Sequence, residues 1–195
     1  LLYLAGARLS HILGTLLLAM IPLYYQLFHV GYRARRLMAF LDPWGNAQGA
    51  GYQLTQALLA FGSGGLFGKG IGASQLKQLS LPDPHTDFIF PVIGEELGFI
   101  GALGLVSLFV FWGIRGWQTA RRAPDLYGQL LAAGITCWIL IQATINMCVS
   151  MGLLPTKGLP MPFVSFGGTS ILITMAAVGI LLNISSQCPS DGMRT

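Results

Sequence analysis

Long apolar runs alternate with polar stretches along this chain, and four of the runs are long enough to cross a membrane as helices. They lie at about Ile12–Val30, Pro91–Trp112, Leu130–Leu154 and Thr169–Ser185. An α-helix of about 20 residues spans the roughly 30 Å hydrocarbon core of a bilayer. A shorter stretch, Leu1–Leu9, is typical of the end of a preceding helix. The pattern predicts an all-α, polytopic integral membrane protein with four transmembrane helices plus that helix end.

A long polar region of about residues 31–88 separates the first two runs. It has no apolar run of membrane-spanning length, although Leu54–Phe61 is suited to a short interfacial or re-entrant helix. Loops this long are usually functional or disordered, and the aromatic residues spread along this one argue against disorder. We therefore expect a long, structured extracellular loop.

Basic residues in short loops indicate the orientation. Arg115, Arg121 and Arg122 lie in a short connection, which the positive-inside rule places in the cytoplasm. By alternation, the long loop and the connector of residues 155–168 face outside. Residues 1–186 then form the membrane domain, and residues 187–195 form a cytoplasmic tail.

The composition supports a membrane protein and excludes a nucleic-acid-binding one. Hydrophobic residues make up 53% of the chain and charged residues only 9%, with a mean hydropathy of +0.64, against about 25% charged residues in a soluble domain. The net charge is +4, but the basic residues are dispersed between apolar runs. Basic residues on the outer side oppose the usual bias, and a phosphate-bearing ligand would explain them.

The most polar stretch is Leu81–Phe90, which contains Asp83, His85, Thr86 and Asp87 at the start of an apolar run. Because a carboxylate near hydrocarbon loses hydration, this cluster is energetically costly unless it has a function. Asp87 could simply cap a helix that begins near Pro91, since proline disfavours the α conformation in the residue before it. A helix N-terminus also attracts anions, so the same place suits a reaction site for phosphate.

Other polar groups have structural alternatives. Glu95 and Glu96 point about 100° apart on a helix, and an ion pair between helices competes with a supporting role at a site. Gln142 and Asn146 share a helix face and favour interhelical hydrogen bonds. The glycine-rich stretch of residues 62–72 departs from the phosphate-binding loop pattern and favours tight turns, with Lys69 either solvated or phosphate-binding.

Five strings, in order and spacing, resemble the SEDS family of peptidoglycan glycosyltransferases (FtsW, RodA and SpoVE). They are YRARRLMAFLDPW, GYQLTQALLAFGSGGLFGKGIG, LPDPHTDFIF, GEELG and LLPTKGLPMPFVSFGGTS. The PTKGLP sequence is more similar to that of the division member, FtsW, than to that of the elongation member, RodA. The resemblance covers the C-terminal part of the family's ten-helix architecture, so a cavity between its two halves would be incomplete, and we expect this segment alone to be inactive.

The resemblance implies polymerisation of lipid II into glycan strands on the outer face of the bacterial cytoplasmic membrane during cell division. Asp87 matches the family's essential aspartate and is the expected catalytic base. A divalent cation, Mg²⁺ or Mn²⁺, held by Asp87 is compatible with this chemistry. The partners expected are a class B penicillin-binding protein, which is a transpeptidase, and other divisome proteins.

Charge and location add further candidates. The substrate-binding candidates are Arg33, Arg36, Lys69, Lys77, His85, Thr86, Lys157 and Ser165, and the supporting candidates are Glu95, Glu96, Gln56 and Ser170. Two other functions remain open. One is a lipid II flippase or transporter, which would also have interrupted helices and intramembrane carboxylates. The other is a non-catalytic scaffold for a transpeptidase.

Overall fold

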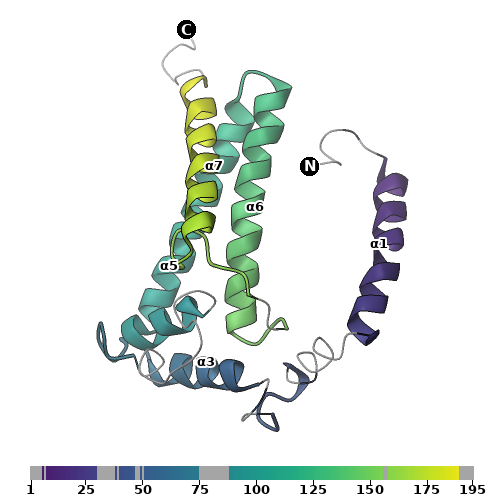
Figure 1. Ribbon diagram of the computed structural model, residues 1–195. Helices are drawn as coiled ribbons and strands as arrows, with labels where there is room; N and C mark the ends of the chain where they lie inside the picture. Colours follow the sequence, from purple (N-terminus) through teal and green to yellow (C-terminus); the bar gives the residue numbers. More distant parts are fainter. Residues whose placement is uncertain are drawn as a thin grey trace.

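The computed structural model is all-α (Figure 1). It describes residues 6, 8–29, 38, 40–46, 49, 51–74, 88–155 and 158–188. The helices are α1 (Leu9–His29), α3 (Tyr52–Ser63), α5 (Ile89–Arg122), α6 (Leu126–Ser150) and α7 (Gly168–Ser186).

Helices α5, α6 and α7 form an antiparallel bundle, and each is long and apolar enough to cross a membrane. Helix α5 has 34 residues, and the 24 residues that follow Gly98 form a continuous helix about 36 Å long. This exceeds the hydrocarbon core of about 30 Å, so both of its ends can reach the membrane surfaces. Large apolar side chains on the bundle, such as Leu108, Phe111 and Leu172, are exposed in the isolated chain, as lipid-facing residues are.

Small residues bring α5 and α6 close together. A Cβ at Gly116 would overlap Thr136, and one at Gly113 would lie 2.8 Å from the Leu140 side chain. Close backbone approach at small residues is the usual way that helices pack in membranes. Asp125 caps the start of α6, because its carboxylate accepts a 2.9 Å hydrogen bond from the Gly128 N–H.

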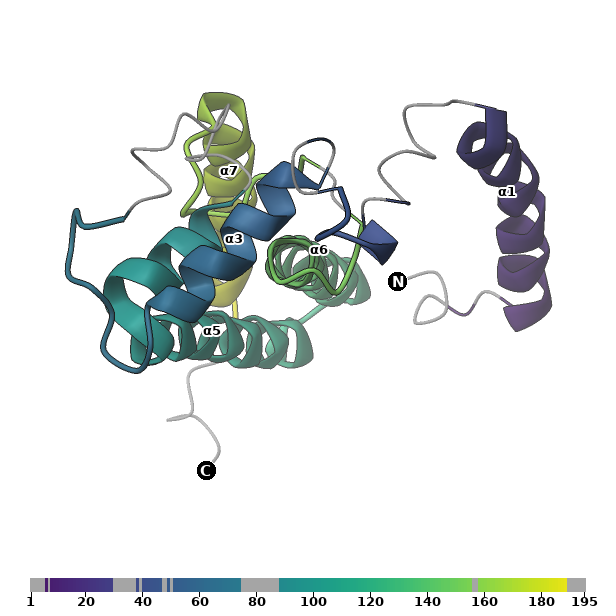
Figure 2. The same ribbon diagram turned by 90° about the horizontal axis from the view of Figure 1, so that it is seen from below.

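Helix α3 lies across the lower end of the bundle in Figure 1 and beside the start of α5 in Figure 2. Its buried residues are the apolar Leu54, Ala57 and Ala60, together with Thr55, whose hydroxyl is hydrogen-bonded to the Gly51 carbonyl. Helix α1 stands apart from the bundle in both views. Three of its leucines, Leu16, Leu17 and Leu18, are more than 60% exposed, which suits hydrocarbon rather than water.

The structure confirms an all-α fold and the predicted short helix in the long loop. Three of the four predicted spans are long and apolar enough to cross a membrane among the described residues. The first coincides with α1, but its described apolar part, Leu9–Met20, is shorter than a span.

Of the two predicted boundaries of α5, the start was close and the end was wrong. The helix begins at Ile89, two residues before the predicted start near Pro91, because the first-turn N–H groups need no helical partner and proline is tolerated there. At its other end, α5 continues to Arg122, so Arg115, Arg121 and Arg122 lie on the helix and not in a connecting loop.

Candidate active site

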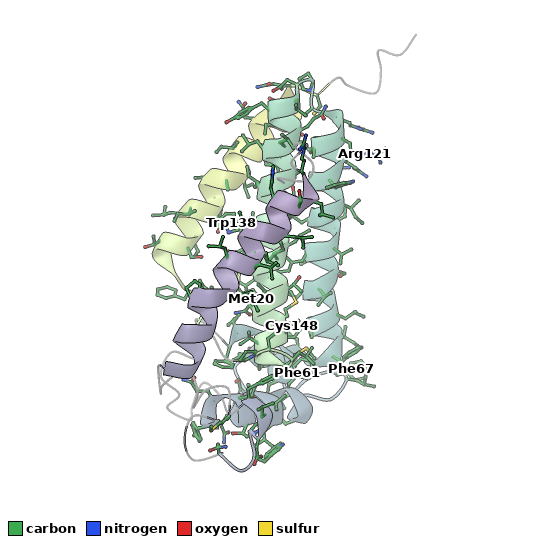
Figure 3. The ribbon with its side chains drawn as sticks, turned by 90° about the vertical axis from the view of Figure 1, so that its right-hand side faces the viewer. Met20, Phe61, Phe67, Arg121, Trp138 and Cys148 are labelled. Atoms are coloured by element: carbon green, nitrogen blue, oxygen red, sulfur yellow. The ribbon has the colours of Figure 1, made fainter. Side chains whose placement is uncertain are left out.

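The candidate site lies where α3, residues 64–74 and the first turns of α5 meet. Phe61 and Phe67, labelled in Figure 3, lie at this end of the bundle, and Arg121 lies at the opposite end. The Phe61 ring stacks on the Phe90 ring, with centroids 5.7 Å apart and planes inclined by 28°. This aromatic pair fixes the end of α3 against the first turn of α5.

Helix α5 is interrupted at Gly98, whose φ of 71° and ψ of −166° are not helical. In an unbroken helix, the Phe99 and Ile100 N–H groups would donate to the carbonyl oxygens of Glu95 and Glu96. Here these N–H groups donate instead to the carbonyl oxygens of Gly65 (2.9 Å) and Leu66 (3.3 Å).

The two carbonyl groups released by this break are also used. The Glu95 oxygen accepts a 2.9 Å hydrogen bond from the Lys69 N–H, and the Glu96 oxygen accepts a 3.0 Å bond from the Gly70 N–H. The loop of residues 64–70 therefore replaces the missing helical bonds one for one. Because buried backbone groups must be paired, this exchange allows the helix to break inside the protein.

Four glycines make this close approach possible. Added Cβ atoms would overlap the Gly94 carbonyl at Gly64, the Glu96 carbonyl at Gly68, the Phe61 ring at Gly94 and the loop backbone at Gly98. The glycines form two pairs with a spacing of four, Gly64 with Gly68 and Gly94 with Gly98. This small-xxx-small spacing is the sequence signal that could have predicted the contact.

A buried carboxylate lies beside this backbone contact. The Glu95 side chain is only 1% exposed, and its Oε1 accepts a 2.9 Å ion-pair hydrogen bond from Lys69 Nζ. Its Oε2 accepts a 2.8 Å hydrogen bond from the Ser74 hydroxyl. Both donors come from the loop, so Glu95 forms its ion pair with a loop and not with another helix. The neighbouring Glu96 is also buried, at 8% exposed.

Two amides on α6 hold the connector that precedes α7. Gln142 donates a 2.9 Å hydrogen bond to the Pro160 carbonyl, and Asn146 donates a 2.6 Å bond to the Leu159 carbonyl. The sequence predicted that these amides share a helix face, but their partners are backbone groups of the connector. The buried Ser165 hydroxyl accepts a 2.8 Å hydrogen bond from the Met161 N–H and tightens the turn that follows.

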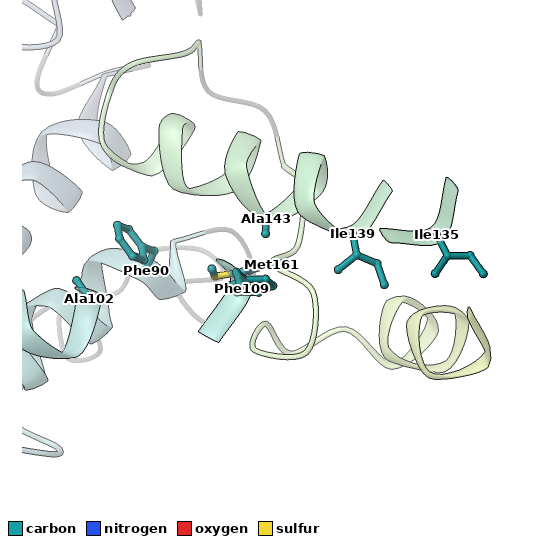
Figure 4. Packing of buried hydrophobic residues seen from close by; sticks show 7 residues of the cluster. All are labelled: Phe90, Ala102, Phe109, Ile135, Ile139, Ala143 and Met161. Atoms are coloured by element: carbon teal, nitrogen blue, oxygen red, sulfur yellow. The ribbon is translucent and has the colours of Figure 1, made fainter. Parts of the chain in front are cut away.

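One apolar cluster joins the connector to the start of α5. Met161 and Phe90 are 1% and 3% exposed and belong to the same buried cluster (Figure 4). The remaining members come from α5 and α6, and they are Ala102, Phe109, Ile135, Ile139 and Ala143. The same packing therefore fixes both the connector and the beginning of α5.

The structure brings some of the predicted site residues together. Lys69 and Glu95 are paired, whereas Gln56 lies partly buried on α3 and Ser170 lies partly buried in the first turn of α7. Seven candidates lie outside the described residues: Asp87, Arg33, Arg36, Lys77, His85, Thr86 and Lys157. In the part of the chain that the structure describes, no three His, Cys, Asp or Glu side chains gather as a metal site would require.

A comparison of sequences identifies the family. The profile of the FtsW/RodA/SpoVE family, described as cell cycle protein, matches residues 1–189. The chain belongs to this family. SEDS proteins are multi-pass membrane proteins, in agreement with the long apolar helices of the bundle.

Curated relatives agree with this assignment. The chain is 47% identical over 186 residues to the probable peptidoglycan glycosyltransferase FtsW of Geobacter metallireducens, covering 95% of this chain and 50% of the relative. It is 44% identical over 184 residues to stage V sporulation protein E of Bacillus subtilis, covering 94% and 50%. The chain thus spans about half the length of the curated relatives it matches.

Two solved SEDS structures share the fold. A structure described as a peptidoglycan synthase complex that coordinates polymerization and crosslinking has a TM-score of 0.73 and 27% identity, covering 95% of this chain and 52% of that one. A mutant of the rod shape determining protein RodA from Thermus thermophilus has a TM-score of 0.53 and 35% identity, covering 69% and 41%.

Proposed function

We propose that this chain is part of a peptidoglycan glycosyltransferase that polymerises lipid II on the outer face of the bacterial cytoplasmic membrane during cell division. The names of the FtsW relatives support this activity. The structural observation that carries the proposal is the buried cluster shared by Phe90 and Met161.

Short lengths of chain connect the proposed reacting groups to that cluster. Asp87 precedes Phe90 by three residues, and Lys157 precedes Met161 by four. An extended chain spans at most about 3.5 Å per residue, so the Cα atoms of Asp87 and Lys157 are within about 10 and 14 Å of those of Phe90 and Met161. A carboxylate and a cation can therefore serve the same reaction site.

The proposed reaction needs both kinds of group. Asp87 accepts the proton of the acceptor sugar hydroxyl while the hydroxyl oxygen attacks the anomeric carbon of the donor. The bond between that carbon and the pyrophosphate oxygen breaks, and the lipid pyrophosphate leaves with the electron pair. Arg33, Arg36 and Lys157 stabilise the negative charge on this leaving group.

A divalent cation at Asp87 would supply further positive charge for the pyrophosphate. The described residues contain no cluster of metal-ligating side chains.

We also propose a transpeptidase of the class B penicillin-binding type as a partner. The solved structure with a TM-score of 0.73 is a synthase complex that coordinates polymerization and crosslinking. A polymerase and a crosslinking enzyme use the same growing strand, so their association would keep product and substrate close together.

The test is polymerisation of fluorescent lipid II in vesicles by a protein of the relatives' length that contains this chain. Asp87→Ala should reduce glycan polymerisation by at least about 100-fold, because general-base catalysis contributes about 10²- to 10⁴-fold. Membrane insertion and binding of the transpeptidase should be unchanged.

Asp125→Asn is the matched control, because Asp125 is a helix-capping carboxylate in the short connection between α5 and α6. This variant should polymerise lipid II normally. Full polymerisation by the Asp87→Ala variant would contradict the catalytic assignment. Loss of outward lipid II exposure without a polymerisation defect would favour a flippase.

A further inference from the structure

The Lys69–Glu95 pair is not explained by the proposed reaction. Lys69 is a cation in the outer loop, and its charge alone makes it a candidate for binding pyrophosphate. The structure gives that charge another partner, because Lys69 Nζ lies 2.9 Å from a Glu95 carboxylate that is 1% exposed. Two opposite charges at this distance largely cancel, so the pair offers little net charge to a phosphate group.

The two residues are joined twice. Besides the side-chain ion pair, the Lys69 N–H donates to the Glu95 carbonyl at 2.9 Å. Ser74 adds a third connection through its hydroxyl, which donates to Glu95 Oε2 at 2.8 Å. A buried carboxylate is costly unless it is paired and hydrogen-bonded, and all these donors come from one loop. These contacts of Glu95 therefore stabilise the docked position of the loop.

The contact between the loop and α5 is close in sequence to the proposed reaction site on both sides, through Glu95 on the helix and through Ser74 on the loop. Glu95 lies two turns after Phe88, the N-cap of α5, and Asp87 immediately precedes Phe88. Ser74 is the last described residue before residues 75–87. The network thus fixes the chain at Ser74 to the same two turns of α5 that follow Asp87.

From this geometry we infer that Lys69 and Glu95 are positioning residues of the proposed glycosyltransferase and that Lys69 acts through Glu95 rather than by binding the pyrophosphate of lipid II. The inference rests on the proposed function. It assigns the contacts with the leaving group to other cations of the outer side.

The two roles of Lys69 predict opposite results in a double-mutant cycle. Lys69→Met removes the cation that lies 2.9 Å from the buried Glu95 carboxylate, and removing one partner of such a pair is strongly unfavourable. Misplacement of a site by about 1 Å can cost on the order of 100-fold in rate, so we expect kcat/KM for lipid II to fall by about that factor. Adding Glu95→Gln removes the buried charge that Lys69 balances and should restore at least about tenfold of the loss.

A lysine that binds pyrophosphate would behave differently. Its loss would raise KM whatever residue occupies position 95, and Glu95→Gln would then add to the defect or leave it unchanged. Failure of Glu95→Gln to improve the Lys69→Met variant would overturn the inference. Kinetics are measured only on the monodisperse, folded fraction, because a merely structural defect changes the amount of that fraction and leaves its kcat and KM unchanged.

Loop docking is measured separately by hydrogen exchange at the Lys69 and Gly70 amides, which donate to the interrupted helix. Lys69→Met should accelerate their exchange, and the double variant should slow it again. Unchanged exchange in Lys69→Met would also overturn the inference. This measurement does not depend on lipid II, so it distinguishes failure of the positioning role from failure of the proposed polymerase activity. Asp125→Asn should leave both readouts unchanged.

Discussion

Single glycines determine the geometry of the candidate site. Gly98 has a backbone conformation that L side chains rarely adopt, and its missing Cβ leaves room for the Leu66 carbonyl and the Gly68 N–H. The unusual backbone conformation and the missing Cβ are both required at a residue that lies inside a long membrane helix. A substitution at this position is therefore a test of the loop contact and not of helix propensity.

Gly98→Ala should destabilise the protein by about 1 to 3 kcal/mol from backbone strain alone, and by more because the methyl group overlaps the docked loop. The measurement is thermal or denaturant unfolding in detergent. Exchange of the Lys69 and Gly70 amides should accelerate in the same variant.

Gly104→Ala, in the same helix, is the control for this prediction. Gly104 has nothing within 4 Å of an added Cβ. Alanine at a helix interior is favoured over glycine by about 1 kcal/mol, so this variant should be neutral or slightly more stable. Equal stability of the two alanine variants would show that the break at Gly98 does not hold the loop.

At the scale of secondary-structure elements, α6 acts as a support for the connector. Its amides Gln142 and Asn146 are one turn apart and bind adjacent carbonyl groups of Pro160 and Leu159. Met161 follows directly and enters the buried cluster. The path of the connector therefore depends on a helix that contributes no proposed reacting group.

Asn146→Leu should release the connector from α6. Loss of the donor leaves the Leu159 carbonyl without its hydrogen bond, at a cost of about 1 to 3 kcal/mol. Proteolysis between residues 158 and 166 should accelerate, and polymerisation of lipid II should decrease. The double variant with Gln142→Leu should lose less than the sum of the two single effects, because both amides hold one segment.

Thr144→Ala is the control on the same helix, because the exposed Thr144 hydroxyl binds only its own helix, at Leu140 O, among the bonds described. It should leave the connector protected. Equal proteolysis of the Asn146→Leu and wild-type proteins would contradict the supporting role of α6.

The sequence predicts the elements better than it predicts their contacts. Apolar runs predicted α5, α6 and α7, and a short apolar stretch predicted α3. The break at Gly98 was not predicted, because the apolar pattern continues through it. The docking of residues 64–70 was not predicted either, since it depends on backbone hydrogen bonds, which leave no hydrophobic periodicity. The four-residue spacing of its glycines was the only sequence signal that we find for this contact. For the site, charge indicated Lys69 and Glu95, but only the fold pairs them.

At the scale of the whole molecule, the bundle has two chemically different ends. The loop of residues 64–74 and the connector lie at one end, with the candidate site. The other end carries Arg121 and the short connection to α6 (Figure 3). Cys188, after α7, also lies at this end, where its Sγ donates a 3.8 Å hydrogen bond to the Thr119 carbonyl. The polar ends are therefore well separated along a helix longer than the hydrocarbon core.

This arrangement predicts opposite accessibility for two exposed positions. Phe67 and Tyr127 are 80% and 75% exposed and lie at opposite ends of the bundle. In a variant without Cys137, Cys148 and Cys188, Phe67→Cys should react with a membrane-impermeant maleimide on intact spheroplasts. Tyr127→Cys should react only after permeabilisation. The reverse pattern would place the candidate site in the cytoplasm and contradict the proposed function.

The hydrogen-bond exchange at Gly98 also determines the order in which the chain is assembled. Residues 64–70 are synthesised before residues 94–100, yet the Lys69 and Gly70 N–H groups and the Gly65 and Leu66 carbonyl groups bond to that later segment. The loop must therefore wait in an undocked state until α5 has left the ribosome and entered the membrane. A chain arrested before residue 100 would contain a complete loop with no place to dock, so this end of the bundle matures only after the first turns of α5 are made.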